Sequence, residues 1–167
     1  MRILTLIAST AAVVATATVG GLATRPALQS VWYRQLRKPP YQPPRTVFPA
    51  VWPALYADIA VVSAATVDSL RYAGNRPAAR AYLSWLAANL VLNAAWSWVF
   101  FHRRRLAAAV VVNAALTASS ADLARRAIAV RGRGAAPLVL YPVWCAFALL
   151  LSAHIWLLNR RRRIDPP

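Results

Sequence analysis

Aromatic and amide side chains recur at helical spacing in one apolar stretch of the chain. Successive members are four, four, three and four residues apart: Trp85, Asn89, Asn93, Trp96 and Phe100. This spacing places them on one stripe of a helix. An amide in hydrocarbon is costly unless it is hydrogen-bonded. The stripe therefore indicates either hydrogen bonds between helices or the wall of a pocket for a flat aromatic ligand.

Two other apolar stretches carry comparable stripes. The first contains Trp52, Tyr56, Ile59 and Ser63, and the second contains Tyr141, Trp144, Ala148, Leu151 and Ile155. Indole and phenol rings suit a macrocycle because they stack and also donate hydrogen bonds. The alternative is an interfacial aromatic belt, which best describes Trp32, Tyr33 and Trp156 near the ends of their runs.

Other chemistry is not indicated by the sequence. There is no Ser/His/Asp set, paired carboxylate or phosphate-binding loop, so we predict no catalytic residue. The single cysteine, Cys145, reads as a small packing residue, and no metal site is predicted. His154 is interpreted as a packed or hydrogen-bonded histidine rather than a haem ligand.

An aspartate, Asp58, lies within the second apolar stretch, where an acid is expensive. It lies about 200° around the helix from Tyr56, so it does not share the Trp52/Tyr56 face. We expect it to stay protonated or to pair with a neighbouring helix, with Asn113 and His154 as possible partners.

Composition points to a membrane. Apolar residues make up 59% of the 167 residues, and the net charge of +16 comes from 20 basic against four acidic side chains. The arginines lie between apolar runs or just after the last one, as in loops that flank membrane spans. Nucleic acid is disfavoured as a partner because the charge follows no single face or helix.

The apolar runs predict the fold class, an all-α membrane protein with a five-transmembrane-helix bundle in one domain, 1–167. The expected spans are 3–23, 48–67, 81–101, 106–123 and 135–159. The first run is long enough for a retained helix rather than a cleaved signal peptide.

The connections are predicted as loops over 24–47, 68–80 and 125–134. The first holds Pro39, Pro40, Pro43 and Pro44, which favour extended or turn backbone. Basic residues are more numerous on the side of the first loop and the tail. This predicts the N-terminus outside and the C-terminus in the cytoplasm. The composition, rich in arginine and alanine, suggests a bacterial protein, so a bacterial cell membrane is expected.

Small residues recur seven positions apart in the third run, as Ala87-Ala88 and Ala94-Ala95. Small seams let membrane helices approach closely. This seam is the predicted homodimer interface.

Three segments together resemble the TspO/MBR family. Residues 32–44 read WYRQLRKPPYQPP, similar to the family's W-Y-x-x-L-x-K-P-x-W-x-P-P, and residues 90–101 read LVLNAAWSWVFF, similar to L-x-L-N-x-x-W-x-x-x-F-F. The last run carries Trp144, Phe147-Ala148 and Leu158-Asn159 at the family's spacing. This chain departs from the pattern at Tyr41, where the family has tryptophan, and at Ser152, where it has asparagine.

The resemblance implies a five-helix bundle, often a homodimer, with a pocket between the helices closed by the first loop. Family members bind porphyrins, and eukaryotic members also bind cholesterol and benzodiazepine-type drugs. Some bacterial members promote light-dependent breakdown of protoporphyrin. The predicted ligand-binding residues combine the stripes with the loop: Tyr33, Tyr41, Trp52, Tyr56, Asn93, Trp96, Trp144 and Ala148.

These observations favour a membrane receptor or carrier for porphyrin-type tetrapyrroles, protoporphyrin or haem, with a regulatory or stress-response role. The porphyrin or haem is expected as a ligand, and no cofactor is required. One alternative is an enzyme-like protein that degrades porphyrin in light. A second is a ligand-free membrane interaction protein.

Overall fold

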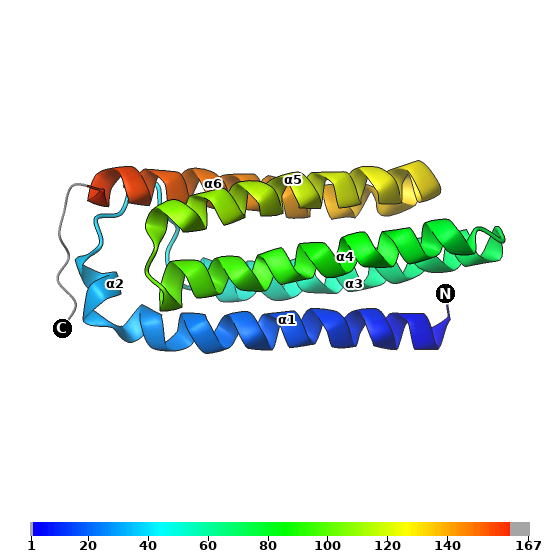
Figure 1. The fold of residues 1–167 in the computed structure, drawn as a ribbon, viewed down its shortest axis with the longest axis horizontal. Coiled ribbons are helices and arrows are strands. Elements are labelled where there is room, and N and C mark those ends of the chain that lie inside the picture. The colour runs from blue at the N-terminus through cyan, green and yellow to red at the C-terminus, as the bar shows by residue number, and fades with distance from the viewer. Residues whose placement is uncertain (1, 161–167) are drawn as a thin grey trace.

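A computed structural model describes residues 2–160, which are mostly helical and contain no strand. The five helices of 20 residues or more within this range are α1 (Ile3–Gln29), α3 (Val47–Tyr72), α4 (Arg76–Ser97), α5 (Leu106–Arg131) and α6 (Leu140–Asn159) (Figure 1). Three shorter elements join them: α2 (Val31–Gln35), the π-helical η1 (Trp98–His102) and the 3₁₀-helical η2 (Gly132–Val139). The all-α prediction is confirmed.

The long helices lie lengthwise in one bundle (Figure 1). One end, the loop end, carries α2 and the turn between α4 and α5. The opposite end, the N-terminal end, carries the start of α1, the turn between α3 and α4, and η2. α1 packs against α3 and α4, and α5 packs against α4 and α6, whereas α3 touches α6 only sparsely.

Four segments are long and apolar enough to cross a membrane: Ile3–Gln29, Val47–Tyr72, Arg76–His102 and Leu106–Asn159. The last has 54 residues, more than twice the roughly 20 residues that one span needs. It contains α5 and α6, which pack extensively against each other after the chain turns at η2. The five long helices therefore agree with the five expected spans.

The helices extend further than the apolar runs, and parts of the predicted loops were wrong. α1 continues through Pro26 to Gln29 because Ala23 and Ala27 are buried against the rest of the bundle. α3 continues to Tyr72 and α4 begins at Arg76, capped by the Asn75 side chain on the Ala78 N–H at 3.1 Å.

The predicted loop over 125–134 is helical as far as Arg131. Asp122 forms ion pairs with Arg125 at 2.6 Å and Arg126 at 2.5 Å, at the i+3 and i+4 positions that support a helix. Gly132, with φ of 55°, ends α5. The fifth helix begins at Leu140 rather than 135, because 132–139 winds as a 3₁₀ helix.

The core has two parts. The central part joins α3, α4, α5 and α6 around Ile59, Leu116 and Tyr141. The loop-end part is aromatic and contains Trp32, Tyr33, Phe100, Phe101 and Ile155. The π-helical turn changes the residue spacing at the end of the third long helix. Two consecutive residues, Phe100 and Phe101, are both buried there.

Small side chains bring α1 close to α4. A Cβ added at Gly20 would lie 3.2 Å from the Ser97 hydroxyl. Trp98, one residue further on, donates from its indole N–H to the Val19 carbonyl at 3.0 Å. This contact fixes α1 in the bundle beside the helix that carries the amide stripe.

Candidate ligand site

An aromatic pair on α3 contacts the amide stripe of α4. The rings of Trp52 and Tyr56, one helical turn apart, have centroids 5.2 Å apart and are inclined at 33°. The Tyr56 hydroxyl donates to Asn93 Oδ1 at 2.9 Å. Three predicted site residues from two helices are thus in direct contact.

The Tyr56–Asn93 bond begins a chain of buried hydrogen bonds. Asn93 Nδ2 donates to the Tyr141 hydroxyl at 3.0 Å, and that hydroxyl donates to Asn89 Oδ1 at 2.9 Å. Asn89 Nδ2 then donates to the Ser120 hydroxyl at 3.1 Å. The chain joins α3, α4, α5 and α6. Both asparagines therefore form hydrogen bonds between helices, which is the first of the two interpretations of the α4 stripe. Tyr141 belongs to the same hydrogen-bond network.

Two indole N–H groups are left without a partner. Trp144 packs its ring against Phe48 and Phe147 at 5.8 and 5.6 Å between centroids. Trp96 packs against Phe100 and Phe101 at 5.7 and 5.9 Å. Both indole nitrogens are buried and have no hydrogen-bond partner among the described residues. Such a donor costs free energy unless an acceptor satisfies it.

The Trp144 indole lies at the sparse contact between α3 and α6. Trp52 from α3 and Trp144 from α6 pack against the central core but are only half-buried. Ala148 from α6 is also half-buried. Phe48 at the start of α3 bridges to Trp144. This α3–α6 seam therefore presents aromatic faces and one small side chain.

The first loop packs over the loop end of the bundle. Tyr33 is buried in the loop-end core, with its ring 5.9 Å from Phe101. The Lys38 ammonium lies 4.5 Å from the centre of that ring and donates to the carbonyls of Tyr33 and Leu36 at 2.6 and 3.2 Å. Burial raises the pKa of the Tyr33 hydroxyl. Burial, and then the nearby Arg45, lower the pKa of Lys38.

Two contacts attach the same loop to α6. The Tyr41 hydroxyl lies 3.0 Å from His154 Nδ1. The Asn159 side chain accepts from the Arg37 N–H at 3.1 Å and donates to the Arg37 carbonyl at 2.9 Å. Asn159 of the family-like Leu158-Asn159 pair therefore has a structural role, because its side-chain amide holds the first loop against α6.

The predicted site residues fall into three groups: one on α3 and α4, one on α6, and one at the loop end of the bundle. Trp52, Tyr56 and Asn93 form the first group, while Trp144 and Ala148 lie on α6. The third group is at the loop end. Trp96 and Tyr33 pack in the aromatic core there, and the Tyr41 hydroxyl contacts His154.

Sequence reasoning missed Phe48, which contacts Trp144, and did not assign His154 or Asn159 to the loop. The helical period indicated none of these three contacts, because each joins segments that are distant in the chain. Trp85 departs from the rest of its stripe: it is 46% exposed and covered by the Arg126 guanidinium at 4.7 Å.

The two partners suggested for Asp58 have other partners. Asn113 donates to the Ser152 hydroxyl at 3.4 Å, and His154 contacts Tyr41. Asp58 Oδ2 is buried without a hydrogen bond among residues 2–160. The suggested pairing with Asn113 or His154 was therefore wrong.

The two alanine pairs of the predicted dimer interface differ in exposure. Ala87 and Ala88 are exposed on α4, whereas Ala94 and Ala95 are half-buried. Val91, between the two pairs, is 67% exposed. Only the first pair, with Val91, is fully available to a second copy.

The fold and the site define a class of protein, a multi-pass membrane protein with apolar helices and an aromatic interior at one end. Residues 8–157 match the model of the TspO/MBR family, and this chain belongs to that family. It is 34% identical over 137 residues to the translocator protein of Ovis aries, covering 79% of this chain and 77% of that protein.

Microbial relatives show the same likeness. The chain is 31% identical over 163 residues to the tryptophan-rich protein TspO of Archaeoglobus fulgidus, covering 95% of this chain and 99% of that protein. It is also 31% identical over 128 residues to protein CrtK of Rhodobacter capsulatus, covering 77% and 78%.

Proposed function

We propose that this protein is a membrane receptor or carrier that binds porphyrin-type tetrapyrroles, protoporphyrin or haem, at the α3–α6 seam, with a regulatory or stress-response role. The observation that carries the proposal is the buried, unpartnered indole N–H of Trp144 at this seam, beside half-buried aromatic faces. A second unpartnered indole N–H, that of Trp96, lies in the loop-end core, which also includes the Trp144 neighbour Phe48. A ligand that is flat, apolar on its faces and supplied with acceptors at its edge would satisfy both features.

The described residues fit such a ligand by stacking and by donation rather than by coordination. The rings of Trp52 and Trp144 offer stacking area on the two sides of the seam, and Ala148 leaves room between large neighbours. His154 Nδ1 is in contact with Tyr41, and Cys145 is buried against Ser120. We therefore expect recognition of the macrocycle itself.

The loop would act as the cover of this site. Its attachment to α6 through Asn159 and His154 places Tyr41 above the helix that carries Trp144 and Ala148. The four prolines restrict the loop before any ligand binds, which reduces the entropy lost on ordering.

Titration of the detergent-purified protein with protoporphyrin tests the proposal, with tryptophan fluorescence as the readout. Saturable quenching at a ratio of one porphyrin per chain is expected. The matched comparison is Trp144→Phe/Trp96→Phe, which keeps both rings but removes both free N–H groups, and should weaken binding. Quenching that rises linearly without saturation would instead favour the ligand-free interaction protein.

We infer in addition that the C-terminal side of the bundle faces the cytoplasm of a bacterial cell. Arg25, Arg34, Arg37, Arg45 and Arg103–Arg105 lie at the loop end, where α6 also ends. The N-terminal end has a similar number of arginines but also holds Asp68 and Asp122. The tail 161–167 lies outside the described residues. A reporter fused after Pro167 should be active only as a cytoplasmic reporter, and a periplasmic signal would reverse the orientation.

A further inference from the structure

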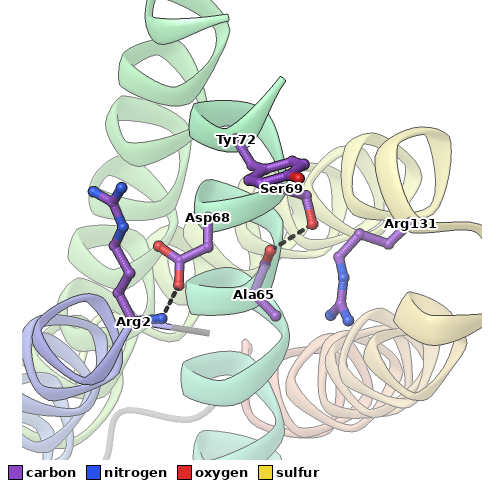
Figure 2. A pocket seen from close by; sticks show the side chains of 6 residues that line it. All are labelled: Arg2, Ala65, Asp68, Ser69, Tyr72 and Arg131. Atoms are coloured by element: carbon purple, nitrogen blue, oxygen red, sulfur yellow. Dashed lines mark hydrogen bonds between the residues drawn. The ribbon is translucent and has the colours of Figure 1, made fainter. Parts of the chain in front are cut away.

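A cavity of about 410 Å³ lies at the N-terminal end of the bundle (Figure 2). Its lining comes from the N-cap of α1 and from α3 and α5: Arg2, Ala65, Asp68, Ser69, Tyr72 and Arg131. The helical rise puts Ala65 about 20 Å along α3 from Trp52. The cavity is therefore separate from the proposed tetrapyrrole site.

The acid in this cavity is already engaged. Asp68 accepts from the backbone N–H of Arg2 and from the Thr5 hydroxyl at 2.8 Å. Arg71 donates to the same Thr5 hydroxyl at 3.3 Å, which places a further cation beside the pair. Both Asp68 oxygens are thus occupied by α1, and the carboxylate is not left to attract a cation.

The two arginines of the lining are not engaged in this way. Figure 2 shows Arg2 and Asp68 on one side of α3 and Arg131, from the end of α5, on the other, with Ala65, Ser69 and Tyr72 between them. The side chains of Arg2 and Arg131 make no hydrogen bond or ion pair within residues 2–160. Two guanidinium groups therefore stand free at opposite rims of the cavity.

The surroundings of the cavity distinguish a lipid from a free anion. A mostly apolar stripe runs from it toward the start of α3, where Ala65 is followed by Val61, 48% exposed, and then by exposed Ala57 and Ala54, with half-buried Asp58 at its side. Tyr72, 97% exposed, stands at the helix end, where membrane proteins place amphipathic rings. Guanidinium groups suit phosphate by charge and by fork geometry.

We propose that this cavity binds the headgroup of an anionic phospholipid, with an acyl chain along the outer stripe of α3. Arg131 holds the phosphate, and Arg2 adds positive charge from the opposite rim. The Ser69 hydroxyl, which donates to the Ala65 carbonyl at 2.9 Å, retains lone pairs for a headgroup hydroxyl. The net charge of the lining selects an anionic headgroup over a zwitterionic one.

Native mass spectrometry of the full chain in detergent tests this site, with dioleoyl phosphatidylglycerol as the probe and dioleoyl phosphatidylcholine as the zwitterionic comparison. Wild type should retain the first lipid more tightly. Arg131→Gln and Arg2→Gln should each weaken it about five-fold, as expected for one basic side chain near an anionic headgroup. Arg2→Gln leaves the backbone contact to Asp68 in place. Arg133→Gln, an exposed residue outside the lining, makes the same charge change and should keep wild-type affinity.

Three results overturn the proposal. Equal loss in Arg133→Gln and Arg131→Gln would show diffuse charge attraction. Glycerol phosphate binding as tightly as the lipid would show a free-anion site. Unchanged lipid affinity in Arg131→Gln would remove the site altogether. The unfolding temperature without lipid checks that each variant is folded, and Arg131→Lys, which keeps charge but not the fork, should retain intermediate affinity.

Discussion

The side-chain amide of Asn159, at the end of α6, binds both the N–H and the carbonyl of Arg37, 122 positions earlier in the chain. The same Nδ2 also donates to the Ile155 carbonyl at 2.7 Å. The amide thus pairs with both backbone polar groups of Arg37, while its orientation is fixed by its own helix. This contact holds the first loop over the bundle.

Asn159→Leu should release the loop. Two net hydrogen bonds are worth about 2 kcal/mol together, which corresponds to local opening that is about thirty-fold more frequent. Hydrogen exchange of the amides in 31–42 measures it. Asn159→Asp, which keeps an acceptor for the Arg37 N–H, should show a smaller increase. Wild-type exchange in Asn159→Leu would mean that the loop is held elsewhere.

Asn93→Leu should destabilise the bundle. The substitution removes the acceptor of the Tyr56 hydroxyl and the donor to Tyr141, in the middle of the buried chain. Interhelical hydrogen bonds in membrane proteins average below 1 kcal/mol each, so a loss of about 1–2 kcal/mol in unfolding free energy is expected. Denaturant unfolding in mixed micelles measures it. Asn113→Leu breaks one longer bond, to Ser152, and should cost less; the reverse order would contradict the network.

Ala148→Phe should abolish protoporphyrin binding by filling the space beside Trp144, and the protein should remain folded. Ala146→Phe adds the same ring on the exposed face of α6, two residues away, and is the matched control. Fluorescence titration compares the two. Wild-type affinity in Ala148→Phe would show that the ligand does not enter the α3–α6 seam.

Trp144→Phe should keep at least a tenth of the affinity, because a ring remains for stacking while one free N–H is lost. Any light-driven conversion of bound porphyrin that needs an indole should be suppressed. Absorption spectra during illumination measure the conversion. Trp85→Phe, at an exposed position on α4, is the control. Equal conversion in wild type and Trp144→Phe would exclude this indole from the chemistry.

Ala87→Phe/Ala88→Phe should yield monomers in mild detergent if α4 forms the dimer interface. Both alanines are exposed, so larger side chains there disturb a partner rather than the monomer core. Light scattering measures the mass. Ala107→Phe/Ala108→Phe places the same pair on exposed positions of α5 and should leave the mass unchanged. A dimer that survives the α4 changes would place the interface on another helix.

Sequence alone predicted the helices but not their ends. Apolar runs are a property of composition, so the number of long helices followed from counting them. Their ends depended on local pairing and packing. The ion pairs of Asp122 with Arg125 and Arg126 support the extension of α5. Burial of Ala23 and Ala27 supports the extension of α1. Neither effect can be read from hydropathy.

Helical spacing also predicted that Tyr56 shares a face with Trp52 and that Asn93 shares one with Trp96, because residues three and four apart on a helix must be neighbours. The tertiary structure alone decided which faces meet. It joined Tyr56 to Asn93, left two indoles without partners, and set Asn159 against Arg37. The period within each helix is local, whereas the rotation of one helix against another is fixed by side-chain packing across the whole bundle.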